Sequence, residues 1–101
     1  MSEFQMPASP DVAELLNAIA CEMVDQFGIT RAEAVARINE QWHRQDLSSN
    51  DEIILHEDEY FWALFIYFGG EVPNWSRDAN RSEWIPKPVP TRDSGYWPMP
   101  D

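Results

Sequence analysis

Cysteine, positive charge and long apolar runs are all scarce in this chain of 101 residues. Cys21 is the only cysteine, which excludes a disulfide within the chain and favours a reducing compartment. The longest apolar run has nine residues, Tyr60 to Phe68, whereas a membrane helix needs about 18. The first ten residues lack the basic and apolar regions of a secretory signal. We therefore predict a cytoplasmic protein without a membrane segment.

Lys and Arg number 7 against 18 Asp and Glu, so the formal net charge is −11 and the pI is near 4.3. Such a chain repels nucleic acids and anionic lipids and attracts basic proteins, although the same acidity can serve solubility alone. The charge is uneven, because residues 45–76 hold seven acidic residues and no Lys or Arg. We expect a basic protein to bind this acidic block, and neither nucleic acid nor membrane to bind it.

The first predicted element is a helix over about 10–27. Ser9 can cap its start, Pro10 suits the first helical position, and Gly28 suits the position after its end. Apolar residues recur along one stripe with helical spacing. Cys21 lies between small and apolar neighbours, so we interpret it as a packing residue.

A second helix is predicted over about 31–45. Thr30 and Glu33 have the spacing of a capping box. Its apolar face is narrow, and the remaining Arg, Glu, Asn and Gln side chains should face solvent. The short connection to the first helix predicts that the two helices pack as a helical corner or hairpin.

The third element is the segment "HEDEYFWALFIYFGG", from His56 to Gly70. An acidic start and a Gly-Gly end favour a helix over a strand, with Asp58 as its cap. Its aromatic and aliphatic residues occupy all sides, so we expect it to be the central buried element. One face would be formed by Phe61, Leu64, Phe65 and Phe68. The preceding residues 53–56 fit either a short β element or a turn of helix.

The C-terminal part, residues 71–101, holds six of the eight prolines. Proline breaks helices and ladders, which predicts an extended tail. Because the tail also carries Trp75, Trp84 and Trp97, we expect it to wrap the helices with its indoles as anchors. The predicted fold is thus mainly α, a single domain of three helices. Its parts are a flexible N-terminus (1–9), a helical body (10–70) and the tail (71–101).

The motifs of enzymes and metal sites are missing from the sequence. There is no nucleophile elbow, no phosphate-binding glycine loop, and no second cysteine for a zinc site. The run from His56 to Glu59 carries ligand-type side chains, but it does not have the H-E-x-x-H spacing. We predict a protein that is not an enzyme and that has no cofactor and no bound metal.

The segment "HEDEYFWALFIYFGG", with "GITRAEAVARINEQW" before it, resembles a group of small, acidic, functionally uncharacterised bacterial proteins. The resemblance covers about residues 25–70 and is carried by His56, Glu57, Asp58, Trp62, Ala63, Ile66, Tyr67, Phe68 and Gly69. These proteins are similar in size and acidity to immunity proteins of bacterial toxin systems. The resemblance implies that the chain binds and inhibits a basic toxin.

These observations predict a non-enzymatic, acidic protein-binding module, in its most concrete form an immunity-type inhibitor of a basic toxin. The predicted contact residues are Asp46, Asp51, Glu52, Glu57, Asp58, Glu59 and Trp75. The alternative is a small regulatory DNA-binding or scaffold protein that uses the helical corner as a helix-turn-helix. In that alternative Arg31, Arg37 and Arg44 would contact phosphates. The sequence indicates no oligomeric state.

Overall fold

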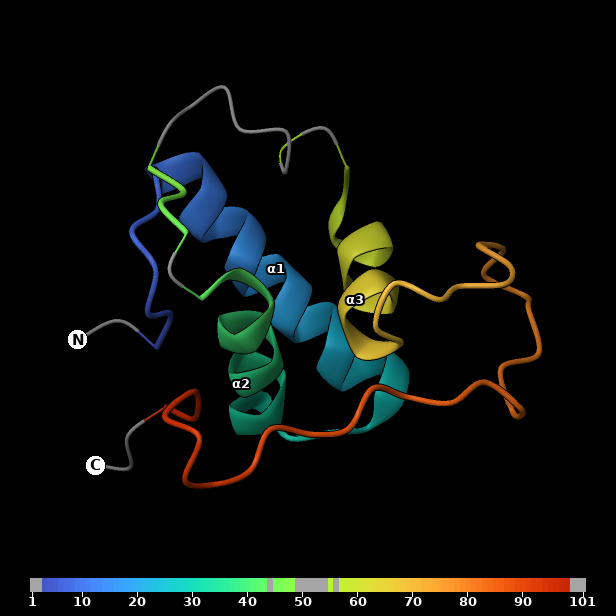
Figure 1. Ribbon diagram of the computed structural model, residues 1–101. Coiled ribbons are helices and arrows are strands. Elements are labelled where there is room, and N and C mark those ends of the chain that lie inside the picture. The colour runs from blue at the N-terminus through green and yellow to red at the C-terminus, as the bar shows by residue number, and fades with distance from the viewer. Residues whose placement is uncertain (1–2, 44, 49–54, 56, 99–101) are drawn as a thin grey trace.

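Three helices, α1 (Pro10–Phe27), α2 (Arg31–Trp42) and α3 (Glu59–Tyr67), form the body of the computed structural model. The structure describes residues 3–43, 45–48, 55 and 57–98. The long helix α1 packs against both other helices, which contact each other less (Figure 1). Within those described ranges there is no strand, and one parallel bridge joins Ala8 to Leu47. The predicted mainly α fold of three helices is confirmed.

The ends of α1 are those that the sequence predicts. The Ser9 side chain accepts a hydrogen bond from the backbone N–H of Val12 at 3.3 Å, so it caps the helix start. Gly28 follows the last turn with a φ of 66°, the left-handed conformation that glycine adopts without steric cost. Its N–H donates to the carbonyl of Val24 at 3.0 Å and so satisfies one of the final carbonyls.

Helix α2 begins as predicted and ends earlier, at Trp42 instead of residue 45. The Thr30 hydroxyl accepts from the backbone N–H of Glu33 at 3.1 Å, which is the first half of the capping box. The Glu33 carboxylate accepts from Nε of Arg37 at 2.9 Å, one turn further along. The Glu33 carboxylate therefore has two roles. It lies in the first turn, at the positive end of the helix dipole, and it orients the side chain of Arg37.

The third segment is a helix, as the sequence favours. The Asp58 carboxylate accepts from the backbone N–H of Phe61 at 2.9 Å and caps its start. Gly69 and Gly70 follow its end with φ of 66° and 87°. The sequence leaves a short β element or a turn of helix open for residues 53–56. Of these residues, all but Leu55 lie outside the described ranges.

Apolar side chains from all three helices meet in one main core. Its α1 and α2 residues are the predicted apolar stripes, and α3 adds Ala63 and Ile66. The core residues of the two longer helices are Val12, Leu16, Ile19, Ala20 and Met23 from α1 and Ala34, Val35, Ile38 and Trp42 from α2. A second cluster of Tyr60, Leu64 and Phe68 lies under Trp84 of the tail. Among the described residues, no helix has the length and apolar character needed to cross a bilayer.

The polar face of α2 is solvated only in part. Arg37 and Asn39 are buried, so the prediction of a wet outer face is wrong at these two positions, while the other polar residues of the helix are partly exposed. Asn39 is completely buried, because two irregular segments cover it. Its amide donates to the carbonyls of Glu3 at 3.1 Å and Tyr96 at 2.8 Å, and its Oδ1 accepts from the backbone N–H of Gln5 at 3.0 Å. One buried amide thus joins the N-terminal segment and the end of the tail to the same helix.

The tail returns along α3 and α2 to the side where the N-terminal segment lies (Figure 1). The backbone N–H of Lys87 donates to the carbonyl of Tyr67 at 2.8 Å, and Nη1 of Arg37 donates to the carbonyl of Lys87 at 2.8 Å. Lys87 also pairs with Glu40 of α2 at 3.3 Å. The tail wraps the helical body, as predicted, and polar contacts to α2 hold it in addition to the indole of Trp84.

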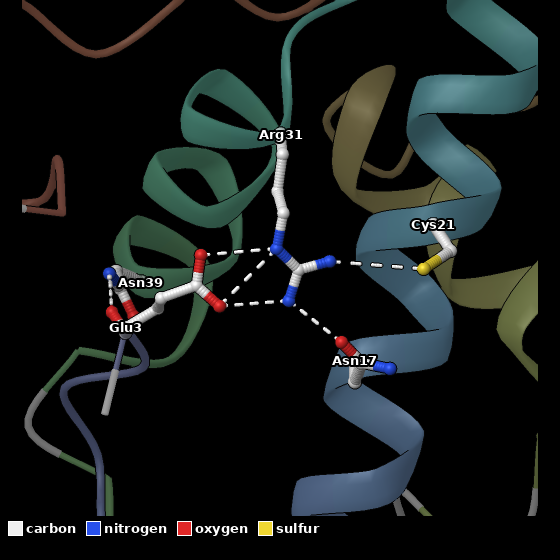
Figure 2. Close-up of polar contacts among 5 residues, drawn as sticks. All are labelled: Glu3, Asn17, Cys21, Arg31 and Asn39. Atoms are coloured by element: carbon white, nitrogen blue, oxygen red, sulfur yellow. Dashed lines mark hydrogen bonds and ion pairs between the residues drawn. The ribbon is translucent and has the colours of Figure 1, made fainter. Parts of the chain in front are cut away.

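Arg31, at the start of α2, joins the N-terminal segment to α1 (Figure 2). Its Nη2 lies 2.8 Å from Glu3 Oε1 and donates to Asn17 Oδ1 at 2.7 Å, while Nη1 lies 3.8 Å from the sulfur of Cys21. Cys21 is exposed, so its interpretation as a packing residue is wrong. The segment 3–9, predicted to be flexible, makes these contacts and the bridge at Ala8.

Candidate protein-binding surface at the start of α3

The acidic end of α3 consists of Glu57, Asp58 and Glu59. Glu57 and Asp58 are exposed and Glu59 is partly exposed. Asp58 has a structural role as the helix cap, and all three lie at the positive end of the helix dipole, which favours carboxylates. Three of the predicted contact residues are therefore adjacent at the surface, at the beginning of one helix.

Four basic residues of the described chain pair with carboxylates elsewhere, whereas Arg81 and Arg92 lie against the rings of Tyr60 and Trp97. The ion pairs are Arg31–Glu3 at 2.8 Å, Arg37–Glu33 at 2.9 Å, Arg77–Glu22 at 3.9 Å and Lys87–Glu40 at 3.3 Å. Over the ranges that the structure describes, no ion pair reaches the acidic end of α3. At this end, no ion pair between described residues neutralises the negative charge that the sequence concentrates between residues 45 and 76.

An aromatic stack formed by Phe61, Phe65 and Trp75 lies next to these carboxylates. The ring of Phe61 is 4.7 Å from that of Trp75, with 9° between their planes, and 5.9 Å from that of Phe65, with 20° between their planes. None of the three residues belongs to either core cluster. Trp75 is 41% exposed, and the two phenylalanines are partly exposed.

This stack corrects the prediction that α3 is a central element buried on all sides. The central helix is α1, and α3 packs on it from one side (Figure 1). Its buried residues are Tyr60, Ala63, Leu64 and Ile66. Phe61 and Phe65, which we placed on one face with Leu64, turn outward and are covered only in part, by Trp75 and the chain near Gly70.

Two arginines of the tail mark the border of this surface at Tyr60. The guanidinium of Arg77 lies 4.0 Å from the centre of the Tyr60 ring. Arg81 donates to the Tyr60 hydroxyl at 2.7 Å and to Gln26 Oε1 of α1 at 3.1 Å. These contacts hold the middle of the tail against α1 and α3 and keep both guanidinium groups on the Tyr60 side.

Asp46 does not join the acidic end of α3. Its segment, 45–48, lies beside the start of α1, because the Leu47 N–H donates to the carbonyl of Pro7 at 2.7 Å; the start of α3 lies apart from it (Figure 1). Asp46 is exposed and accepts from the backbone N–H of Ser48 at 2.9 Å. The Ser48 hydroxyl, and then this N–H, hold the pKa of the Asp46 carboxyl below its usual value. Asp51 and Glu52 lie outside the described residues.

The arrangement offers charge and flat apolar surface. In the described ranges, no three His, Cys, Asp or Glu side chains form a group that could hold a metal ion. Carboxylates beside exposed rings are suited to bind a cationic protein surface, in which charge attracts and the rings supply buried area.

Sequence reasoning placed Trp75 at this surface and missed Phe61, Phe65 and Glu71. Glu71 is exposed and directly follows Gly70. The backbone N–H of Gly70 donates to the Phe65 carbonyl at 2.8 Å. A signal was present: a short helix with apolar residues on all sides cannot bury them all in a three-helix body, because one side must face outward. A tryptophan shortly after its end is a residue able to stack there.

Two of the three arginines of the helix-turn-helix alternative, Arg31 and Arg37, form ion pairs within the described chain. Arg37 is 6% exposed, pairs with Glu33, and lies with its guanidinium 4.6 Å from the centre of the Tyr67 ring. Arg31 is held by Glu3, and Arg44 lies outside the described residues. The terminal segments thus cover α2 at Arg37 and Asn39.

Comparison with known proteins adds no assignment to this surface: no protein-family model, no curated protein and no solved structure matches the chain.

Proposed function

We propose that this protein is a non-enzymatic, acidic protein-binding module, and in its most concrete form an immunity-type inhibitor of a basic bacterial toxin. The observation that supports the proposal best is the acidic end of α3, three carboxylates without an ion pair among the described residues, beside the exposed Trp75. Such a combination is typical of surfaces that bind basic proteins.

The proposed mechanism is charge-steered occlusion. The net charge of −11 attracts a cationic partner over distance, which raises the association rate. In the complex, Glu57, Asp58 and Glu59 neutralise basic residues of the partner, and Trp75 adds apolar area that anchors the contact. When those basic residues line a toxin's substrate-binding cleft, the same contacts inhibit the toxin.

The test is capture of a partner from native lysate at low salt, using the whole chain as bait, with each captured protein identified by mass spectrometry. The variant Glu57→Gln/Asp58→Ser/Glu59→Gln removes three charges, and Ser keeps the capping hydroxyl that the helix needs. The matched control Asp11→Asn/Glu14→Gln/Asp25→Asn removes three charges from exposed positions of α1. Circular dichroism checks that both variants fold.

We expect wild type and control to capture the same basic protein, the α3 variant to lose it, and high salt to release it. Inhibition of that protein's toxicity on coexpression tests the immunity form. If the α3 variant captures the partner as well as wild type does, the site is elsewhere. If nothing basic is captured, the proposed function is wrong.

A further inference from the structure

The aromatic stack of Phe61, Phe65 and Trp75 has no role in either core cluster. One face of the Trp75 indole is covered by Phe61, at 4.7 Å between ring centres, so much of its 41% exposure belongs to the opposite face and the ring edges. Exposed flat rings favour contact with another molecule over water. The question is which chemical group fits this surface.

Carboxylates border the stack at both ends. Asp58 accepts from the backbone N–H of Phe61, and exposed Glu71 follows Gly70, where an added Cβ would lie 3.6 Å from the ring of Phe65. Helix α3 itself contains no Lys or Arg, and Arg77, the nearest arginine along the chain, lies over Tyr60 and pairs with Glu22 at 3.9 Å. The charge complementarity of the stack is therefore toward a cation.

The negative charge at the borders of the aromatic stack also favours one kind of binding partner over the others. A second copy of the chain would bring its own net charge of −11, and nucleic acid or an anionic membrane would bring phosphates. All of these are repelled by the acidic residues at the borders. A cationic protein segment is the occupant that both the charge and the rings favour.

Among cations, the rings favour guanidinium over ammonium. A guanidinium is planar and weakly hydrated, so it stacks on an aromatic face while its edge donates to a carboxylate. The protein makes this contact within its own chain, where Arg92 lies 3.9 Å from the centre of the Trp97 ring and Arg77 lies 4.0 Å from that of Tyr60. The rings of the aromatic stack have no such arginine from the described chain.

We infer that the aromatic stack is an arginine-binding site: an arginine of a cationic protein partner stacks on the free face of Trp75 and donates to Asp58 or Glu71. The inference rests on the proposed function and names the side chain that the partner contributes. It makes the surface selective for arginine over lysine at equal charge.

The experiment titrates the full chain at low salt with a Gly-Arg repeat peptide and with a Gly-Lys repeat peptide of equal length, followed by calorimetry. We expect the Gly-Arg peptide to bind about 2- to 5-fold more tightly. Trp75→Ala should abolish this ratio by weakening the Gly-Arg peptide alone, and Trp75→Phe should retain most of it, because the flat ring remains. Circular dichroism of each variant checks the fold.

The possible outcomes distinguish failure of the arginine site from failure of the proposed function. Equal affinity for the two peptides, unchanged in Trp75→Ala, overturns the arginine site and leaves the acidic binding module in place. Binding of neither peptide overturns both proposals. Self-association of wild type in sedimentation that Trp75→Ala removes would show a second copy on the stack, which also overturns the arginine site.

Discussion

The buried amide of Asn39 should be one of the most sensitive positions in the protein, and Asn39→Ala tests this. The side chain is completely buried and makes three hydrogen bonds to backbone groups, between 2.8 and 3.1 Å long. Each bond contributes about 1 kcal/mol to folding, so their loss costs about 3 kcal/mol. Total stabilities of domains are about 5–15 kcal/mol, which makes this a large fraction.

The assay is urea unfolding followed by circular dichroism and by tryptophan fluorescence. The matched control is Asn17→Ala: Asn17 is exposed on α1 and bonds Arg31 at 2.7 Å, so we expect a loss below about 1 kcal/mol. A second variant, Asn39→Leu, keeps a similar volume and removes only the hydrogen bonds. It should be destabilised nearly as much as Asn39→Ala.

Asn39 also holds both terminal segments, so its loss should expose them to protease. In Asn39→Leu, limited proteolysis should cleave near Gln5 and Tyr96 faster than in wild type at the same fraction folded. If Asn39→Leu unfolds within about 0.5 kcal/mol of wild type, the amide only fills space and the reasoning is refuted.

Three further predictions concern the helix ends and the N-terminal ion pair. Asp58→Ala should lose about 1 kcal/mol in urea unfolding, because the cap of α3 disappears, and Asp58→Ser should lose little; equal losses would contradict the capping role. Gly28→Ala should lower the melting temperature by roughly 4–8 °C, because its φ of 66° costs alanine about 1 kcal/mol while nothing lies within 4 Å of the added methyl group; an unchanged melting temperature would contradict this. The pKa of the Glu3 carboxyl is held below its ordinary value, mainly by the hydrogen bond from Arg31, so the unfolded chain binds the proton more tightly and stability falls as the pH drops below the ordinary glutamate range. Glu3→Gln should therefore lose stability less steeply on acidification, by a small amount because the pair is exposed, and an identical pH profile would show that the pair contributes nothing.

Local chemistry made the helices predictable. Ser9, Thr30 and Asp58 each accept a hydrogen bond from a backbone N–H in the first turn, and Gly28 follows α1 in the left-handed conformation. These signals depend on a few neighbouring residues, so they can be recognised in the sequence alone. The apolar stripes of α1 and α2 were predictable for the same reason, because a 3.6-residue period marks the buried side.

The burial of Asn39 and Arg37 was not predictable, because it depends on segments far away in the chain. Both residues occupy positions that the periodicity marks as solvated, and they become buried only when the N-terminal segment and the tail cover α2. Nothing in residues 31–42 carries this information.

The orientation of α3 could not be predicted from the sequence for a different reason. A helix with apolar residues on every side has no periodicity from which to read the buried face. Its packing on α1 turns Phe61 and Phe65 outward, and the tail then brings Trp75 onto Phe61. The acidic residues beside them were predictable as a cluster in sequence, whereas the separation of Asp46 from them follows from the path of segment 45–48 along the start of α1.

The central claim is that the acidic end of α3 and the aromatic stack together bind a cationic partner. Its most direct test is an NMR titration of the ¹⁵N-labelled full chain with the Gly-Arg peptide. We predict that the largest shift changes occur at the amides of residues 57–61 and at the Trp75 indole N–H, with little change at the exposed carboxylates of α1. Changes that are equally large around Asp11, Glu14 and Asp25 would show that binding follows net charge alone, and would contradict the claim.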